Sequence, residues 1–430
     1  MKENSWRRLG VFLLLVLAVV CLFFLIEIPS SKAPHLTVIG FAKMADGLGR
    51  QSVELMDGLY DDVELGFIPS SKSDLKDVPE RIQHLITQPN DNQGKIVIYE
   101  SALPSPNEKA EIRLNRVLKG VKNNHQIRIA YSMLESSRIP SKWAELLNKY
   151  FDAVVVPDTF LVDVYQCSGV EIPVFVLPLG LDIASFLERP LKRSRNTPFR
   201  FVNVSSMVPR KNHEGLIRAF YQAFGDDPEI ELHLNYRPNG SSRHLDRIEH
   251  LIQSLNVHNI FLGSKRLDHQ QYLEFLLQGD ALVSLSKGEG FSIQPREAMA
   301  LGLPVIISNN TAHTTIVKSG LVYAVPCPTT ECAYNKSLRC ECGEEYVADV
   351  YEAAKALRYV YENYETCLES SSQSKQWAAQ YQFKNLKPLY LTLVNPSKVV
   401  LGNSNELTEG CLTTSSEELY KKYITLTTPK

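Results

Sequence analysis

Short apolar runs alternate with amphipathic segments over the first half of this chain. The runs are typical of buried strands, and apolar residues three or four positions apart are typical of helices. Repeated alternation of the two favours a doubly wound parallel sheet. The expected strands are Leu36–Phe41, Val63–Ile68, Lys95–Tyr99, Ile127–Tyr131, Ala153–Val156 and Val174–Leu177, and the expected helices are Gly47–Leu59, Val78–Ile86, Asn107–Leu118, Trp143–Phe151 and Phe160–Tyr165.

A second alternating set begins at Phe199. Two doubly wound sheets in tandem place a cleft between them, and such sheets bind ligands at the carboxyl ends of their strands. Helical spacing returns from Val350 to Tyr381. In the second set we expect strands at Phe201–Val204, Ile230–Leu234, Ile260–Leu262, Ala281–Leu285 and Val305–Ile307, and helices at His213–Phe224, Leu245–Leu255 and Gln271–Leu277, with a further helix before Val305.

The length of 430 residues suggests two or three domains, each large enough to bury a core. The pattern predicts an N-terminal Rossmann-like domain that ends at the segment Pro178–Asp182, and a polar, basic linker after it. A Ser/Thr/Glu/Lys-rich end is typical of a fraying terminus. The predicted parts are 34–182 for the first domain, 183–198 for the linker, 199–370 for the second domain, 371–400 for a helical segment and 401–430 for a flexible tail.

The N-terminus carries an uncharged apolar stretch, Gly10–Ile26. A membrane helix needs roughly 17–25 residues, whereas the apolar core of a cleaved signal peptide is usually about 7–15 residues long. Ser31–Ala33 is followed by Pro34, a poor context for cleavage. We therefore expect an uncleaved transmembrane signal-anchor at 10–28 after a cytoplasmic tail at 1–9.

Positive charges before this stretch favour a cytoplasmic N-terminus, with the rest of the chain across the membrane. In a eukaryote, the protein would then be a single-pass membrane protein facing the lumen of the Golgi or the ER. In a bacterium we expect the opposite orientation, on the cytoplasmic face of the inner membrane. The charges are Lys2, Arg7 and Arg8.

The overall charge gives no sign of a nucleic-acid partner. The net charge is −2 and the pI is ≈ 6.6, whereas a nucleic-acid binder normally shows a basic face. Apolar residues make up 44% and charged residues 22%, as in a globular protein.

Four cysteines fall in one short segment with the spacing C-x4-C-x7-C-x-C. Two local disulfides, free thiols and a zinc site all remain open, although zinc sites prefer C-x2–4-C pairs. The segment lacks helical periodicity and is interpreted as a loop or insertion. The cysteines are Cys327, Cys332, Cys340 and Cys342.

Two glutamates bracket a loop and the start of a helix between two expected strands. Pro295 suits a first helical turn because its missing N–H needs no partner there, and Gly302 with Pro304 is typical of a helix end. An open helix N-terminus attracts phosphate through its free N–H groups and its dipole. Glu289 on the loop and Glu297 inside the helix can each accept hydroxyls of a sugar or ribose. The segment therefore predicts a site for a sugar joined to a nucleotide diphosphate, the alternative being an ordinary loop and helix with solvated glutamates.

These glutamates belong to a longer pattern, which runs through Gly288-Glu289-Gly290-Phe291, Pro295-Arg296-Glu297-Ala298-Met299-Ala300 and Gly302-Leu303-Pro304-Val305-Ile306. The pattern resembles the donor-site signature of the family-4 (group 1) retaining glycosyltransferases. Their fold is GT-B, in which two doubly wound Rossmann-like domains face a cleft. The resemblance covers roughly Leu36 to Tyr381 and implies transfer of a sugar from a nucleotide-sugar donor to a glycan, lipid or protein acceptor, with retention of anomeric configuration.

The resemblance also implies roles for individual residues. Glu289 would contact the donor sugar and Glu297 the ribose. Lys211 matches the lysine of the family's donor-phosphate loop and, with Arg210, would stabilise the leaving diphosphate, the main electrostatic task in breaking the bond. Ser205 stands where a common form of the motif has arginine. The other donor-binding candidates are Gly288, Gly290, Phe291 and Ser292.

In the first domain, Gly47 and Gly49 resemble the family's glycine-rich loop, which reaches the acceptor and the donor phosphates. Glycines let a backbone approach a ligand closely at a helix start. Glu135 stands close to the place where many relatives have a histidine facing the donor sugar, and either binds a sugar hydroxyl or lies at a helix N-terminus.

No Asp-x-Asp occurs in the sequence, so the metal-binding motif of the other large glycosyltransferase fold is missing. We expect an enzyme without cofactor or metal, whose partners are a nucleotide sugar, an unknown acceptor and the membrane. The alternatives are a GT-B epimerase or phosphorylase, and a non-catalytic scaffold that binds nucleotide sugars or glycans.

Overall fold

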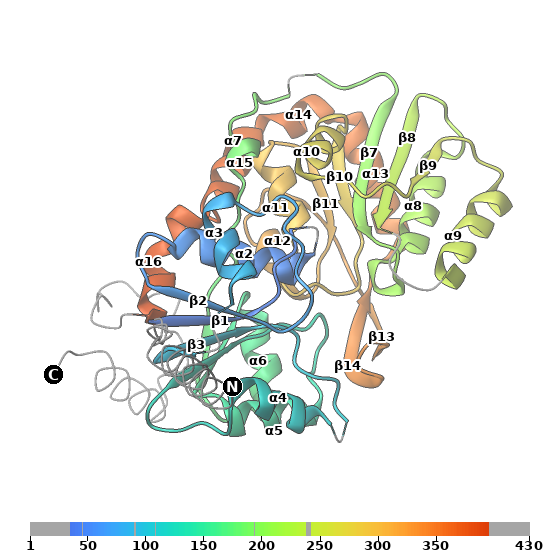
Figure 1. Cartoon of the computed structure of the whole chain (residues 1–430). Coiled ribbons are helices and arrows are strands. Elements are labelled where there is room, and N and C mark those ends of the chain that lie inside the picture. The colour runs from blue at the N-terminus through green and yellow to red at the C-terminus, as the bar shows by residue number, and fades with distance from the viewer. Residues whose placement is uncertain are drawn as a thin grey trace, which may run out of the picture.

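Two six-stranded parallel sheets form the centres of two domains in the computed structural model (Figure 1). It describes residues 35–394 except 45, 90–91, 108, 193 and 238–241. The predicted anchor at 10–28, the tail at 1–9 and the tail at 401–430 lie outside these residues. Within them, no helix combines the length and apolar character needed to cross a membrane.

The first sheet has the strand order β2-β1-β3-β4-β5-β6. Its two faces are covered differently: α2, α3 and the C-terminal α16 pack on one, and α4, α5 and α6 on the other. Alternate residues of β1 divide between these cores, as a strand buried on both faces requires. The elements are β1 Leu36–Gly40, α2 Gly47–Leu59, β2 Leu65–Pro69, α3 Glu80–Thr87, β3 Ile96–Glu100, α4 Ala110–Leu118, β4 Ile127–Tyr131, α5 Ser141–Tyr150, β5 Ala153–Val156, α6 Phe160–Cys167, β6 Val174–Val176 and α7 Ala184–Leu187.

The second sheet has the order β12-β11-β10-β7-β8-β9, the Rossmann order when read from β9 to β12. α8, α9 and α13 cover one face, and α10, α11 and α12 cover the other. The elements are β7 Phe199–Ser206, a 3-10 turn η1 Pro209–Lys211, α8 His213–Phe224, β8 Ile230–Arg237, α9 Ser242–Leu255, β9 Ile260–Gly263, α10 His269–Leu277, β10 Ala281–Ser284, α11 Ile293–Ala300, β11 Val305–Ser308, α12 Thr311–Val317, β12 Tyr323–Val325, α13 Val350–Glu362, α14 Tyr364–Glu369, α15 Ser371–Ala379 and α16 Phe383–Val394.

Every expected strand and helix is present, with ends displaced by a few residues at most. The helix between the two glutamates begins at Ile293, so Pro295 lies in its first turn as predicted. Gly302 adopts a φ of 75°, the left-handed conformation that favours glycine after a helix. α7 is a short helix that the polar character of the predicted linker did not indicate.

The C-terminal helix α16 returns to the first domain. Phe383 packs over two glycines, where a Cβ on Gly58 or Gly180 would lie 2.1 Å or 2.4 Å from its ring. Tyr390 donates to the carbonyl of Pro178 (2.8 Å) and accepts from the amide of Gly180 (3.2 Å). One hydrophobic core consequently continues through both domains and includes β1, α11 and α16.

The cysteine-rich segment forms an antiparallel hairpin of β13 (Thr329–Asn335) and β14 (Cys340–Val347), which leaves the second domain and reaches the first (Figure 1). In the hairpin, the amide of Glu344 donates to Ser137 Oγ at 2.8 Å. The carbonyl of Glu344 accepts from the amide of Ser137 at 3.1 Å, and the carbonyl of Cys342 accepts from the amide of Arg138 at 3.2 Å. The sequence analysis interpreted this segment as a loop or insertion and did not predict its two strands.

All four hairpin-segment cysteines are free thiols, so the two disulfides considered from the spacing are wrong. The Sγ atoms of Cys340 and Cys342 lie 3.8 Å apart. Residues two positions apart on one strand point to the same face, so these two thiols lie side by side on β14 without a bond between them.

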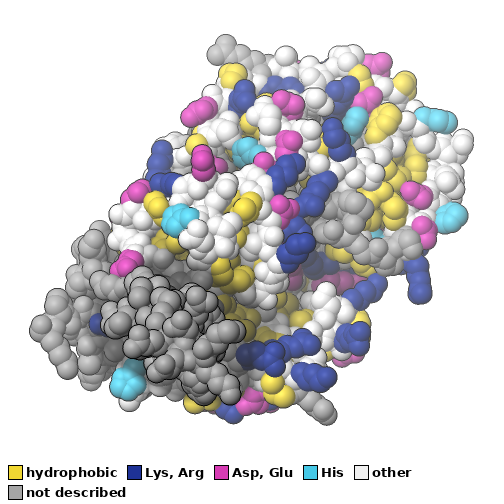
Figure 2. Space-filling model, viewed as in Figure 1, with side chains coloured by type: hydrophobic (Ala, Val, Ile, Leu, Met, Phe, Trp, Pro, Cys, Tyr) yellow, Lys and Arg dark blue, Asp and Glu magenta, His cyan; other side chains and the backbone are white. Residues whose placement is uncertain are grey.

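On the face seen in Figure 2, basic and acidic side chains are interspersed over both domains. The distribution agrees with the net charge of −2.

Candidate functional site: a charged cluster where the domains meet

The candidate site lies at the point where the strand order of the second sheet reverses. β7 and β10 are neighbours there, and their connections leave in opposite directions. Such switch points leave a crevice at the carboxyl ends of the strands, where α/β proteins bind ligands. The loop after β7 carries Arg210 and Lys211, and the loop after β10 carries Gly288 to Ser292.

Four charged side chains meet in this crevice. The ammonium of Lys211 donates to Glu289 Oε1. Arg210 Nη1 lies 3.4 Å from Glu289 Oε2, and Arg210 Nη2 donates to Glu135 Oε1 of the first domain at 3.0 Å. Arg210 also donates to the carbonyl of Gly288. The structure thus joins four of the residues singled out in the sequence, from both domains, into one ion-paired cluster.

The environment keeps Glu289 ionised. Burial by itself would raise the pKa of its carboxyl group, but Lys211 and Arg210 more than offset this and hold the pKa well below its usual range. The side chain is 7% exposed. A paired carboxylate with little solvent around it is a strong hydrogen-bond acceptor, and the two cations next to it suit the charge of a diphosphate.

Gly288 and Gly290 are required by the approach of the first domain. A Cβ on Gly288 would lie 1.9 Å from the backbone oxygen of Glu135, and one on Gly290 would lie 2.9 Å from the sulfur of Met133. A side chain at Gly288 would force the backbone of the facing loop to move, and one at Gly290 would force the side chain of Met133 to move. These glycines therefore set how closely the two domains meet beside Glu289.

A buried histidine holds the start of α11. Ser292 stands before the helix at a φ of 66°, and its hydroxyl lies 2.7 Å from Nε2 of His313. His313 Nδ1 faces the carbonyl of Ser308 at 3.0 Å, so Nδ1 carries the proton and Nε2 accepts from Ser292. Burial lowers the pKa of His313 to about 4, which keeps the ring neutral. The sequence analysis missed His313, because its contact with Ser292 is purely tertiary.

Glu297 is held by residues from both domains. Arg50 of α2 donates to Glu297 Oε1 at 2.7 Å, and Tyr272 donates to Glu297 Oε2 at 2.7 Å. Arg50 also bonds Glu54 one helical turn along, at 2.5 Å. Glu297 is 1% exposed, so both of its oxygens are occupied and enclosed. Sequence reasoning missed Arg50 although it directly follows the glycine-rich loop.

The first glycine-rich loop opens α2. Asp46 caps the helix, its carboxylate accepting from the amide of Leu48 at 3.2 Å. A Cβ on Gly47 would meet no atom within 4 Å, whereas one on Gly49 would lie 2.8 Å from the carbonyl oxygen of Lys43. Gly49 therefore serves the local packing, and Gly47 faces open space at the helix start.

Two predicted donor-binding residues have their side chains in the interior. Ser205 bonds Asn203 Oδ1 at 2.9 Å and Nε2 of His213 at 2.8 Å. The ring of Phe291 packs against Tyr381 and under the guanidinium of Arg296, 3.9 Å from the ring centroid. Both side chains are less than one-tenth exposed. Ser205 is thus part of a buried polar network, and Arg210 is the guanidinium that reaches Glu289.

Within the described residues, no group of three or more His, Cys, Asp or Glu side chains is arranged to hold a metal ion. The described residues include the cysteines of the hairpin segment.

The family model of "Glycosyl transferases group 1" matches residues 187–357, which contain both loops of the cluster. Two curated relatives match part of the chain. One is the GDP-mannose-dependent monoacylated alpha-(1-6)-phosphatidylinositol monomannoside mannosyltransferase of Corynebacterium glutamicum, 26% identical over 47% of this chain and 56% of its own length. The other is the MMP alpha-(1->4)-mannosyltransferase of Mycolicibacterium hassiacum, 31% identical over 37% of this chain and 34% of its own length. The chain thus matches about half or less of the length of these relatives.

Solved structures share the fold. The Anabaena protein Alr3699/HepE in complex with UDP-glucose aligns with a TM-score of 0.61 and 11% identity, covering 84% of this chain and 99% of the Anabaena chain. TarM aligns with a TM-score of 0.51 and 18% identity, covering 70% of this chain and 54% of its own. The two parallel sheets and the likeness to these solved structures agree with the GT-B fold expected from the sequence. The stretch that carries Arg210, Lys211 and the Glu289–Glu297 segment is thus similar to the group 1 glycosyltransferases, among them two mannosyltransferases.

Proposed function

We propose that this protein is a glycosyltransferase that moves a sugar from a nucleotide-sugar donor to an acceptor and retains the anomeric configuration. The observation that carries the proposal is the convergence of Lys211 and Arg210 on Glu289 at the switch point of the second sheet. Two cations beside an ionised carboxylate suit a ligand that combines a diphosphate with a hydroxyl-bearing sugar.

In this proposal Lys211 and Arg210 exchange their carboxylate partners for the diphosphate and offset the charge that develops on the departing nucleotide. Glu289 accepts hydroxyls of the donor sugar, and Glu297 accepts the ribose hydroxyls. Glu297 needs the donor to replace Arg50 or Tyr272 as its partner, since both its oxygens are occupied in the described structure.

We further propose that the reaction needs neither a metal nor another cofactor, because the cations of Lys211 and Arg210 stand where a metal would otherwise offset phosphate charge. We also propose that residues 10–28 anchor the chain as a single membrane pass. Charges before this segment support a cytoplasmic N-terminus and, in a eukaryote, a catalytic part in the Golgi or ER lumen.

GDP-mannose is the first donor to test, because both curated relatives are named as mannosyltransferases. The full chain in mild detergent would be screened by thermal shift against GDP, UDP, ADP and their sugars, with and without EDTA. A shift with one nucleotide that survives EDTA and disappears in Glu297→Ala supports the proposal, and the anomeric configuration of the product, read by NMR, tests retention. Absence of a shift with every nucleotide, in folded protein, would instead favour a non-catalytic scaffold.

A further inference from the structure

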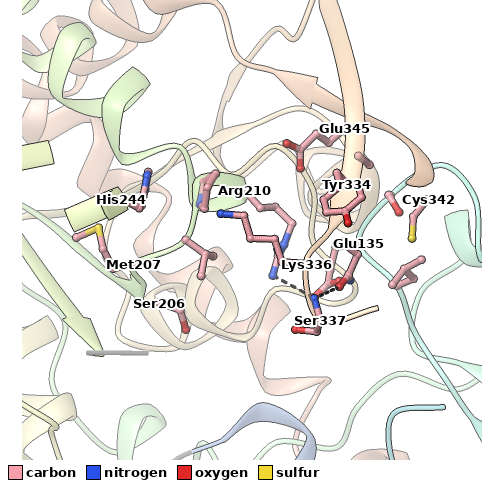
Figure 3. A pocket seen from close by; sticks show the side chains of 16 residues that line it. Glu135, Ser206, Met207, Arg210, His244, Tyr334, Lys336, Ser337, Cys342 and Glu345 are labelled. Carbon is pink, nitrogen blue, oxygen red and sulfur yellow. Dashed lines mark hydrogen bonds and ion pairs between the residues drawn. The ribbon is translucent and has the colours of Figure 1, made fainter. Parts of the chain in front are cut away.

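A cavity of ≈ 520 Å³ adjoins the charged cluster under the β13–β14 hairpin and shares Glu135 and Arg210 with it. Its walls come from the loop after β4 in the first domain, the loop after β7 in the second, helix α9 and the hairpin. Figure 3 shows His244 and Met207 on one side of the space, Cys342 on the opposite side, and Arg210 and Lys336 between them. The volume lies within the range of about 300–1,000 Å³ usual for small-molecule pockets.

The hairpin that closes this cavity is fixed to the first domain. Besides the hydrogen bonds to Ser137 and Arg138, Ser105 Oγ donates to the carbonyl of Ser337 at 3.1 Å. Ala333, Leu338 and Cys342 belong to the hydrophobic core of the first domain. The cavity therefore exists only where the two domains and the hairpin meet.

His244 presents unpaired polar atoms to the cavity. It lines the cavity and is 7% exposed, and neither of its ring nitrogens has a hydrogen-bond partner among the residues that the structure describes. Buried polar groups are normally paired, and an unpaired one costs free energy. A neutral imidazole has one donor and one acceptor nitrogen, which a hydroxyl group can satisfy because it also donates and accepts. Burial lowers the pKa of His244, which favours the neutral ring.

The charges around the cavity favour a neutral ligand. Arg210 pairs with Glu135 at 3.0 Å, and the lining also holds Lys336 and Glu345, where burial raises the pKa of Glu345 to about 7. A phosphate would meet two carboxylates as well as two cations, whereas a polyol can bond to all four. Serine hydroxyls and an amide complete the polar lining, at Ser136, Ser206, Ser337 and Asn335.

Tyr334 adds an aromatic surface at the same place. It stands on β13, lines the cavity and remains 57% exposed. An aromatic ring with one apolar face and a polar tip suits contact with a partly wet ligand. A sugar ring presents C–H groups on its face and hydroxyls at its rim, so it would use Tyr334 and His244 together.

We propose that the cavity under the β13–β14 hairpin binds a neutral sugar unit of the acceptor, with Tyr334 against the ring and His244 hydrogen-bonded to its hydroxyls. The proposal rests on the glycosyltransferase function proposed above. Arg210 belongs both to the cavity and to the charged cluster, so an acceptor held here lies next to the bound donor. The hairpin thereby sets acceptor choice, separately from the loops that hold the donor.

Saturation-transfer NMR on the full chain in detergent tests this inference with named probes: mannobiose, maltose, lactose, N,N′-diacetylchitobiose and mannose 6-phosphate. We expect at least one neutral disaccharide to bind. Tyr334→Ala should weaken that binding about tenfold, the scale of losing one aromatic anchor. Tyr351→Ala is the matched control, since Tyr351 is 58% exposed but lies on α13 outside the cavity, and it should bind as the wild type does.

His244→Leu, checked for an unchanged melting temperature, should also weaken the binding. The inference is overturned if no neutral disaccharide binds, if mannose 6-phosphate binds more tightly than all of them, or if binding survives both Tyr334→Ala and His244→Leu. The nucleotide thermal shift of the same wild-type preparation reports on the donor site separately. A protein that binds a disaccharide through Tyr334 but no nucleotide would refute the proposed function and leave the sugar site standing.

Discussion

The two domains each place a buried carboxyl group at the switch point of their sheet, and they give it opposite charge states. Glu100 ends β3 beside β1 in the first domain, and Glu289 follows β10 beside β7 in the second. Glu100 is 2% exposed and accepts from the neutral amide Gln51 Nε2 at 3.3 Å, and burial raises its pKa to about 8. Glu289 is 7% exposed, and two cations hold its pKa far below the usual range.

The difference shows that related topology does not fix the chemistry of the switch point. In the first domain, the guanidinium of Arg50 pairs with Glu54 and, across the interface, with Glu297. In the second domain, Arg210 and Lys211 both turn toward Glu289. Of these two carboxyl groups, Glu289 is the one held in ion pairs within the described residues, which fits the donor role proposed for the second domain.

The largest effect is expected from neutralising Glu289, the ionised carboxyl group of the comparison. Glu289→Gln keeps the size of the side chain but removes its charge, and we expect turnover to fall about 10²–10³-fold, as for loss of one preorganised polar contact to the reacting groups. Initial rates with the donor identified by thermal shift measure this. Glu362→Gln is the control, because Glu362 is the last residue of α13 and lies outside the charged cluster.

Because Glu289→Gln leaves Lys211 without its carboxylate, folding of the variant is checked by its melting temperature. If the single variant unfolds, Glu289→Gln combined with Lys211→Met restores a neutral pair. Wild-type turnover in a folded Glu289 variant would remove Glu289 from the catalytic machinery.

The second expected effect concerns the cation that the first domain directs across the interface. Arg50→Met leaves Glu54 and Glu297 buried without their cation, so we expect the free energy of unfolding to fall by about 3–5 kcal/mol. Arg218→Met removes a similar pair four residues apart on α8, but Arg218 is 51% exposed. The control should change stability by less than about 1 kcal/mol. Equal losses in the two variants, measured by urea denaturation, would contradict the interdomain role of Arg50.

The third prediction concerns Glu100, the carboxyl group of the comparison whose pKa is raised. Since Glu100 has a pKa of about 8 in the folded protein and a usual value near 4.5 when unfolded, the folded state binds the extra proton between these values. The titration of Glu100 therefore lowers the free energy of unfolding as pH rises from 4.5 to 8, by at most about 1.4 kcal/mol per pH unit. Glu100→Gln should remove this slope and melt higher than the wild type at pH 8. Variant and wild type with the same pH dependence of melting would show that Glu100 is ionised without cost.

The smallest effect has the opposite sign and belongs to the second domain. His313 has a pKa of about 4 in the folded protein, against 6.5 for an ordinary histidine. The unfolded state therefore binds more protons between pH 4 and 6.5, and stability is lost as pH falls through this window. Melting curves of His313→Gln and of the wild type should converge as pH falls from 7 to 4.5. Curves that stay parallel would indicate that His313 is protonated in the folded protein.

Much of the site could be expected from the sequence because local patterns encode it. The strand, loop and helix around Glu289 follow from an apolar run, glycines, Pro295 and Gly302, and each acts within a few residues. The same holds for Lys211, which lies in the turn between β7 and α8. Their meeting follows once the strand order is known, since neighbouring parallel strands bring their carboxyl-end loops together.

Other features depend on contacts between residues far apart in the chain. Arg50 and Glu297 are separated by 247 positions, and Ser292 and His313 by 21. No local pattern distinguishes Arg50 from a solvated arginine on a helix surface. Likewise, the cysteine spacing left disulfides open, whereas the folded segment around the β13–β14 hairpin holds these cysteines as free thiols.

The sequence by itself determined the alternating elements, the two parallel sheets and the residue types of the donor loops, because periodicity and turn chemistry act locally. Only the tertiary structure decided which carboxylates are ionised, which glycines admit the opposite domain and where the hairpin encloses a cavity. Those properties depend on burial and on partners from distant segments, and burial exists only after the chain has folded.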